Sequence, residues 1–184
     1  IVALHGNQHI FRVEIPAFDV RTQPMPTRTY TYTEPDALTT AVRELPYLDV
    51  LRGWRDGTLQ RSTTMESFDL NVLEADTGRV VFSGLPSVVY SNPIGTLHGG
   101  WYSTLLDTAL GSAVQSHLKA GQGQTTLELK LNFVRAVKLD GRPVRCECRS
   151  RHVGRRTGTA EGDIVDADDK LLAHGSTTCL IFDF

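Results

Sequence analysis

The spacing of apolar residues changes from three or four positions to two at about residue 120. Over residues 105–114, apolar positions recur every three or four residues around most of the circumference, which predicts a buried, central helix. Gly121 and Gly123 are expected to end that helix. Leucines then alternate with polar residues over 127–133, which predicts a strand. The same alternation predicts three more strands, and hence a four-strand antiparallel meander, over 144–152, 157–165 and 171–182.

Shorter elements precede the helix. Apolar positions over 47–59 predict a helix that ends near Gly57. The runs 65–73 and 79–83 predict strands, and residues 88–90 predict a further extended piece. One central helix with antiparallel strands before and after it indicates an α+β fold in which a curved sheet wraps the helix.

The N-terminal quarter of the chain has a different pattern. Prolines interrupt it repeatedly between residues 16 and 35, and strand-like alternation occurs over 8–15. We therefore divide the chain into an N-terminal arm, 1–45, which is irregular with short extended pieces, and one domain, 46–184.

Composition narrows the class of protein. The 184 residues are 40% hydrophobic and 22% charged, as in a globular domain, and the net charge of −2 gives no reason to expect nucleic-acid binding. No apolar run reaches the ~18–20 residues that would cross a membrane, and the first residues carry no signal-peptide pattern. Three cysteines without disulfide or zinc-site spacing fit a reducing compartment, so we expect a cytoplasmic protein. His5 and His9 lack a third ligand, and we expect no metal site.

The segment 92–100, with the sequence NPIGTLHGG, contains a pattern suited to acyl chemistry. A glycine pair at a helix start, Gly99 and Gly100, leaves N–H groups free at the positive end of the helix dipole, where an oxyanion is stabilised. Asp107 follows within the apolar run, where burial is expected and an ionised carboxylate is costly. Together these residues suggest hydrolysis of an acyl compound. Alternatively, the glycines serve close packing, and Asp107 caps a helix or pairs with an arginine.

The spacing of these residues adds a second inference. Gly99 and Asp107 are eight residues apart, which corresponds to ~12 Å along a helix. Contacts to one carbonyl require about 3 Å, so both groups can act on the same substrate only if they come from different copies of the chain. The site would then lie at a dimer interface. His98 could act as a base, but its place at the helix start favours a positioning role.

Six arginines lie between residues 142 and 156. The common interpretation of such a run is the solvated face of an edge strand. The turn that follows Gly154 allows a second interpretation, because Arg155, Arg156 and Thr157 beside exposed N–H groups could hold the phosphates of a nucleotide-bearing substrate.

These features resemble the hotdog-fold acyl-CoA thioesterases of the phenylacetate-degradation (PaaI-like) type. The similarity extends over about 47–182 and is strongest at 92–100 with Asp107, at 126–135 (TLELKLNFVR) and at 153–157 (VGRRT). It implies a hotdog fold, in which a curved antiparallel sheet of five to six strands wraps a central helix. It also implies a homodimer formed by joining two sheets edge to edge, usually paired again into a dimer of dimers.

The resemblance further implies roles for single residues. The N–H of Gly99 would polarise the thioester carbonyl, Asn92 would orient the carbonyl or the attacking water, and Asp107 of the opposing subunit would be the nucleophile or the base. Coenzyme A is part of the substrate rather than a separate cofactor, and its phosphates would lie at residues 155–157.

We therefore expect an acyl-CoA thioesterase that releases a free acid and coenzyme A. Trp101, Tyr102, Leu106 and Phe133 are candidates for the acyl pocket, although each also suits a core. The alternative is a non-catalytic acyl-CoA-binding protein of the same fold, which would not need Asp107. A hydratase or dehydratase of this fold would use a differently placed histidine and acid, which the glycine pair does not fit.

Overall fold

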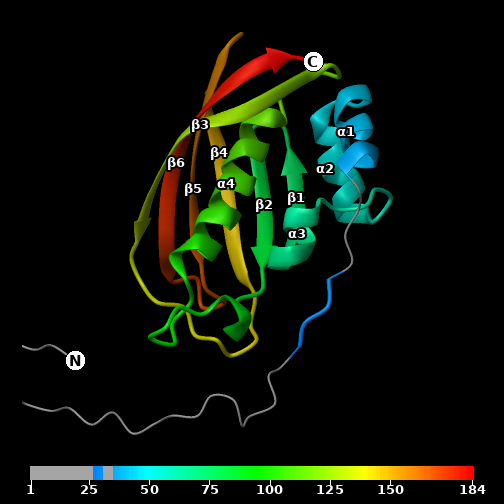
Figure 1. Ribbon diagram of the computed structural model, residues 1–184. Helices are drawn as coiled ribbons and strands as arrows, with labels where there is room; N and C mark the ends of the chain where they lie inside the picture. Colours follow the sequence, from blue (N-terminus) through cyan, green and yellow to red (C-terminus); the bar gives the residue numbers. More distant parts are fainter. Residues whose placement is uncertain (1–26, 31–34) are drawn as a thin grey trace, which may run out of the picture.

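The computed structural model describes residues 27–30 and 35–184, and His5, His9 and the strand expected over 8–15 lie outside them. In this described part, six antiparallel strands form one curved sheet that wraps the helix α4 (Gly99–Gln115) (Figure 1). The order across the sheet is β1-β2-β4-β5-β6-β3. The strands are β1 (Leu70–Asp76), β2 (Arg79–Gly84), β3 (Gln122–Phe133), β4 (Val144–Val153), β5 (Thr157–Val165) and β6 (Leu171–Asp183). This arrangement confirms the predicted α+β fold.

Helix α4 forms the centre of the core. Leu105, Leu106 and Leu110 are fully buried, so the central helix predicted from the apolar spacing is confirmed. The sheet approaches the helix so closely that a Cβ atom on Gly158 of β5 would lie 2.4 Å from Cγ1 of Val114. A glycine is therefore needed at this point of contact between sheet and helix.

The end of α4 differs from the prediction. The helix ends at Gln115, and not at Gly121 or Gly123. Ser116 follows it, and its hydroxyl accepts a 2.8 Å hydrogen bond from the N–H of Gly78, which ties the helix end to the β1–β2 turn. Gly121, with φ of 81°, turns the chain toward β3, and Gly123 lies inside that strand. A polar contact from another element thus stops the helix before the glycines are reached.

The segment before β1 also differs from the prediction. A strand was expected over 65–73, but its first part belongs to a short helix, α3 (Thr63–Phe68). Ser62 begins this helix because its hydroxyl accepts a 3.3 Å hydrogen bond from the N–H of Met65. The extended piece expected over 88–90 is a 3-10 turn, η2 (Val88–Tyr90).

Two further helices lie beyond the β1 edge of the sheet, α1 (Pro35–Glu44) and α2 (Tyr47–Asp56) (Figure 1). Helix α2 confirms the helix predicted there, and Gly57 follows it in the left-handed conformation, with φ of 72°. Helix α1 lies within the predicted arm, 1–45, where no helix was expected; it begins at Pro35, and proline is well tolerated at the first position of a helix. The division of the chain at residue 46 stays a prediction. None of the described helices is long and apolar enough to cross a membrane.

Strand β3 lies at the edge of the sheet, next to β6. After α4, consecutive strands pair only within β4, β5 and β6, so the meander has three strands instead of the expected four. The chain crosses from the β3 edge to the interior of the sheet before β4. The arginine-rich strand β4 therefore lies between β2 and β5, and the expectation of an edge strand was wrong.

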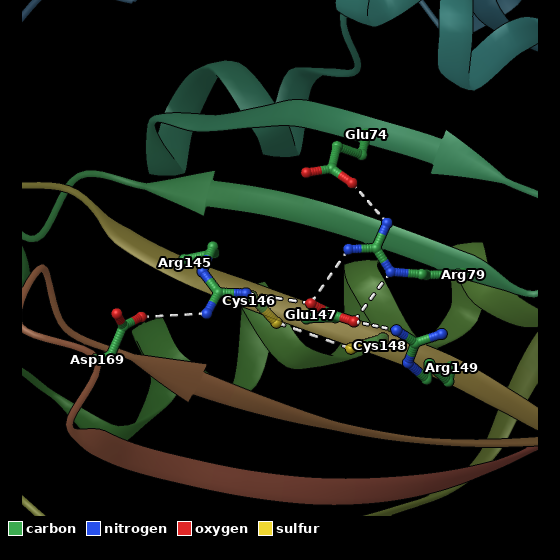
Figure 2. A network of polar contacts seen from close by, with 8 residues as sticks. All are labelled: Glu74, Arg79, Arg145, Cys146, Glu147, Cys148, Arg149 and Asp169. Carbon is green, nitrogen blue, oxygen red and sulfur yellow. Dashed lines mark hydrogen bonds and ion pairs between the residues drawn. The ribbon is translucent and has the colours of Figure 1, made fainter.

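Arg145, Arg149 and Arg151 of β4 are exposed, as expected of a solvated face, and Figure 2 shows the first two. The two cysteines of the strand point to the core, and Glu147 between them lies on the outer face. Glu147 accepts hydrogen bonds from Arg79 at 2.9 Å, from Arg149 at 2.6 Å and from Arg145 at 3.1 Å. The Arg79 guanidinium holds the pKa of Glu147 below its usual value. The outer face is thus an ion-pair network around one carboxylate.

Candidate active site at the start of the central helix

The loop before α4 is closed by the side chain of Asn92. Its Oδ1 accepts hydrogen bonds from the N–H of Ile94 at 3.1 Å and from the N–H of Thr96 at 3.2 Å. Its Nδ2 donates to the hydroxyl of Thr96 at 2.8 Å. Asn92 therefore holds its own loop in shape, and the expected contact with a carbonyl or a water stays a prediction.

His98 is the N-cap of α4. Its Nδ1 accepts a 2.8 Å hydrogen bond from the N–H of Gly100, and its own N–H donates to the carbonyl of Tyr90 at 2.8 Å. Since Nδ1 accepts, the proton of the neutral ring is on Nε2. This geometry supports the positioning role that the sequence favoured over proton transfer.

The N–H of Gly99 is the free donor at the helix start. Within residues 27–30 and 35–184, no hydrogen bond uses this group. A Cβ atom on Gly99 would lie 3.3 Å from Cζ of Phe133, so the absence of a side chain keeps the approach to the donor open. Because the group lies at the positive end of a 17-residue helix, it suits an oxygen that develops negative charge.

Two hollows flank this helix start, and no residue lines both. The first, of about 330 Å³, lies toward β3 and is lined by Leu97, Gly99, Tyr102, Phe133, Val134, Arg135 and Ala136. The second, of about 380 Å³, is called the aromatic hollow below and is lined by Phe68, Tyr90, Ser91, His98, Gly100, Trp101 and Thr104. A substrate with its carbonyl at Gly99 can therefore extend to both sides of the helix.

The candidates for the acyl pocket divide between these hollows and the core. Trp101 lines the aromatic hollow, and Tyr102 and Phe133 line the hollow toward β3. Leu106 is fully buried and belongs to the core. A larger hollow of about 470 Å³ lies on the outer face of the sheet beside Glu147, away from α4. Its polar lining and its distance from the helix start argue against a role in acyl chemistry.

Asp107 lies two turns further along α4. Its Oδ1 accepts a 2.9 Å hydrogen bond from the hydroxyl of Thr126 on β3. The side chain is half-buried, whereas burial was expected, because it lies on the helix face that carries Ser103, Thr104 and Thr108 rather than on the face of the leucines. The carboxylate is thus accessible and oriented by a neighbouring strand.

Thr126 was missed by the sequence analysis. A threonine in a strand has no local signal, and only the pairing of β3 along α4 brings its hydroxyl to Asp107. Gln124, two residues earlier on the same strand, lies against Gly111 of α4, and its Oε1 is buried without a hydrogen-bond partner in the described part of the chain. This side of α4 therefore carries polar groups that a second subunit or a substrate can meet.

The predicted phosphate-binding residues form the turn between β4 and β5. The turn is closed by a 2.8 Å hydrogen bond from the N–H of Gly154 to the carbonyl of Thr157, and Arg155, Arg156 and Thr157 are exposed. Gly158 packs on Val114, so the turn lies at the opposite end of α4 from the glycine pair. The structure therefore does not bring these residues to the helix start within one subunit.

The arginines of the run differ in their partners. Four have carboxylate partners within 4 Å, namely Arg142, Arg145, Arg149 and Arg151. Arg155 and Arg156 have no such partner among the residues that the structure describes. Both guanidinium groups of the turn are therefore available for an anion. The sequence alone did not separate these two arginines from the four that form ion pairs.

One curved antiparallel sheet wrapped around a single central helix is the hotdog fold. A model of the thioesterase superfamily matches residues 94–173. The chain belongs to this superfamily, as the resemblance predicted. A search of curated proteins gave no significant match.

Several solved structures share this fold. The conserved protein PA5202 of Pseudomonas aeruginosa is 32% identical, with a TM-score of 0.62 over 66% of this chain and 95% of that one. The PaaI protein of the Escherichia coli phenylacetic acid degradation operon is 18% identical, with a TM-score of 0.63 over 76% and 96%. A hypothetical thioesterase of Streptococcus pneumoniae, solved with coenzyme A, is 24% identical, with a TM-score of 0.59 over 65% and 91%.

Proposed function

We propose that this protein hydrolyses an acyl-CoA thioester to a free acid and coenzyme A. The observation that carries the proposal is the N–H of Gly99, which lies between two hollows at the start of α4 and has no acceptor among the residues that the structure describes. The thioester carbonyl would accept a hydrogen bond from this N–H, and the negative charge that develops on its oxygen would be stabilised by the helix dipole. The acyl group and the pantetheine arm would extend into the two hollows.

Asp107 of the opposing subunit would activate water at this carbonyl. Within one chain, Gly99 and Asp107 lie two turns apart on the same helix, ~12 Å at 1.5 Å per residue. As base, Asp107 takes a proton from water while the oxygen attacks the carbonyl carbon, the C–S bond breaks, and the thiolate leaves to take up a proton. As nucleophile, the carboxylate forms a mixed anhydride that water then hydrolyses. In both variants the readily departing thiolate removes the need for a general acid at sulfur.

The required dimer would form at the edge strand β3. This strand ends the sheet, and the side chains of Leu127 and Phe133 on it are 61% and 56% exposed. An unpaired edge with apolar side chains is a template for a second copy. Two β3 edges joined in this way give the homodimer, and pairing of two such dimers is expected from the resemblance alone.

The phosphates of coenzyme A would be held by Arg155, Arg156 and Thr157 of the opposing subunit. Along α4, Asp107 is ~10 Å from Val114, where the turn packs, whereas Gly99 is ~22 Å from it. The subunit that supplies Asp107 therefore brings its own turn closer to the reacting carbonyl than the subunit that supplies Gly99. The relative from Streptococcus pneumoniae that was solved with coenzyme A supports this type of substrate.

The test is thiol release from a panel of aryl and aliphatic acyl-CoAs. Wild type should turn over at least one of them, and Asp107→Ala and Gly99→Pro should each lose at least about a hundredfold. Proline suits the first position of a helix but has no N–H, so Gly99→Pro removes the donor. Gly99→Ala keeps the N–H and adds the same Cβ atom beside Phe133, so it separates loss of the donor from crowding. Asp163→Asn on the outer face is the matched carboxylate control and should retain activity.

Mixing the two inactive variants tests the shared site. In a dimer that contains one Asp107→Ala chain and one Gly99→Pro chain, one of the two sites is intact, so random mixing should restore about a quarter of the wild-type activity. No recovery in mixed dimers would contradict a site built from two chains. Absence of thiol release, together with stabilisation of wild type and Asp107→Ala by acyl-CoA, would instead indicate a binding protein.

A further inference from the structure

Arg28 fastens the segment 27–30 to the outer side of the aromatic hollow. Its Nη2 lies 2.6 Å from both carboxylate oxygens of Asp69, the residue that follows α3. Its guanidinium lies 4.7 Å from the ring centre of Tyr30 and 5.4 Å from that of Tyr90. The side chains of Arg28 and Asp69 are only 28% and 30% exposed. One arginine therefore connects the N-terminal segment, the end of α3 and η2.

Tyr90 links Arg28 to the start of α4 through its own contacts. Its ring stacks on Phe68, with centres 5.3 Å apart and planes within 9°, and its hydroxyl donates to the carbonyl of Ser67. Its own carbonyl accepts the 2.8 Å hydrogen bond from the N–H of His98, the N-cap of α4. Burial and the neighbouring Tyr30 hydroxyl raise the pKa of Tyr90 above its usual value, so the ring remains neutral.

The stack continues into the hollow. Trp101 lies 6.5 Å from Tyr90 between ring centres, and its Nε1 donates to the carbonyl of Phe68 at 3.3 Å. Phe68 and Tyr90, both half-buried, thus form the aromatic wall of the hollow beside Gly100, and the buried Trp101 packs against them. Arg28 contacts this wall from behind, through the ring of Tyr90 and through Asp69, and does not line the hollow itself.

We propose that Arg28 is a positioning residue that holds the aromatic wall in place and thereby sets the preference of the hollow for bulky over small acyl groups. This inference rests on the proposed function, and it makes the segment 27–30 part of the substrate site. With the acyl group in the aromatic hollow and the pantetheine arm in the hollow toward β3, a bulky acyl group would contact this wall, and an acetyl group would make far fewer contacts with it. Loss of Arg28 should therefore affect the bulky substrate selectively.

An ordinary ion pair would not have this effect. Exposed pairs contribute little to stability, and their loss acts on all substrates alike. Arg79 and Glu147 provide the matched comparison, because here too an arginine contacts both oxygens of a carboxylate, and the two side chains are 26% and 25% exposed. That pair lies on the outer face of the sheet, away from both hollows (Figure 2).

The experiment compares wild type, Arg28→Ala, Arg28→Lys and Arg79→Ala with hexanoyl-CoA and acetyl-CoA. For Arg28→Ala we expect KM for hexanoyl-CoA to rise about fivefold, with kcat/KM for acetyl-CoA within twofold of wild type. Arg28→Lys keeps the charge but loses the planar guanidinium that lies over the rings of Tyr30 and Tyr90, so we expect an intermediate value. Arg79→Ala should keep the wild-type ratio of the two substrates. An equal loss on both substrates in Arg28→Ala would overturn the inference.

A binding measurement separates this inference from the proposed function. The thioethers S-hexyl-CoA and S-ethyl-CoA cannot be hydrolysed, and calorimetry gives their dissociation constants for each variant. A selective loss of S-hexyl-CoA binding in Arg28→Ala, in a protein that releases no thiol from any acyl-CoA, would support the positioning role and refute hydrolysis. An unchanged ratio of the two constants, or no preference for S-hexyl-CoA in wild type, would refute the positioning role.

Discussion

The carboxylate of Asp107 accepts a 2.9 Å hydrogen bond from the hydroxyl of Thr126, and this contact joins the central helix to the edge strand of the sheet. The two residues are 19 positions apart in the sequence, and only the return of the chain along α4 brings them together. A carboxylate held by one hydroxyl retains further lone pairs for a water molecule. Thr126 thus fixes the orientation of the Asp107 carboxylate and leaves lone pairs on it free to accept a hydrogen bond from water.

Replacement of Thr126 tests this orientation. Thr126→Val removes the hydroxyl at nearly constant shape, and we expect kcat to fall about tenfold with little change in KM, because one positioning hydrogen bond is lost. Thr126→Ser should retain most of the activity. Steady-state kinetics on the best acyl-CoA measures both values, and a Thr126→Val protein with unchanged kcat would exclude the role.

Variants of His98 distinguish capping from proton transfer. His98→Ala removes the acceptor for the N–H of Gly100 and should lower the free energy of unfolding by about 1 kcal/mol, or the melting temperature by about 3 °C. His98→Asn supplies another capping acceptor and should restore both stability and turnover. Thermal unfolding and thiol release give the two readouts. An Asn variant that is stable but as inactive as the Ala variant would identify His98 as a catalytic base.

The close approach of β5 to α4 predicts a large stability effect at Gly158. A Cβ atom there would lie 2.4 Å from Val114, whose branched side chain has little rotamer freedom in a helix. We expect Gly158→Ala to lower the free energy of unfolding by about 2–3 kcal/mol. Gly57→Ala is the control, since it meets open space and only its φ of 72° is strained, which costs about 1 kcal/mol. Urea titration compares the free energies of unfolding of the two variants. Equal decreases would show that the side chains around Gly158 move to accommodate the added methyl group.

The ion pair on the outer face predicts how stability depends on pH. The pKa of Glu147 is lowered by Arg79 in the folded protein, against about 4.3 in the unfolded chain. The pair therefore stabilises the fold above about pH 4.3, and this contribution is lost as the pH falls through the lower pKa of the folded state. We expect Glu147→Gln to be about 1 kcal/mol less stable than wild type near neutral pH, and we expect this gap to narrow as the pH falls below about 4.3.

Two measurements check this prediction. Urea unfolding of wild type and Glu147→Gln at several pH values gives the gap as a function of pH. Arg79→Gln removes the main partner of Glu147 and should flatten the pH dependence in the same way. A gap between wild type and Glu147→Gln that is constant across this range would show that the carboxylate contributes through shape rather than charge.

The elements that the sequence predicts well are those with local periodicity. Helix α4 and strands β4, β5 and β6 follow from the spacing of their apolar residues, and the helix start follows from its glycine pair. The separation of Gly99 and Asp107 along the helix axis can likewise be calculated from their sequence positions, because the rise of a helix per residue is fixed.

The features that sequence reasoning missed depend on contacts between distant segments. The place of β3 beside β6 is a matter of pairing across about fifty residues, which no local pattern encodes. Helix α3 is only six residues long, and its cap at Ser62 is a weaker signal than the alternation that follows. The contacts of Thr126 with Asp107 and of Arg28 with Asp69 likewise join distant segments, and no pattern in the neighbouring sequence predicts them.

Hydrogen exchange would divide helix α4 into two regimes. The amide of Gly99 has no acceptor in the described part of the chain and should exchange with solvent without any opening of the fold. The amides around Leu105 and Leu110 lie at the centre of the core and should exchange only when the whole domain unfolds. The donor that would polarise the substrate is thus rigidly joined to the segment that opens last, so the alignment of this donor lasts as long as the native state itself.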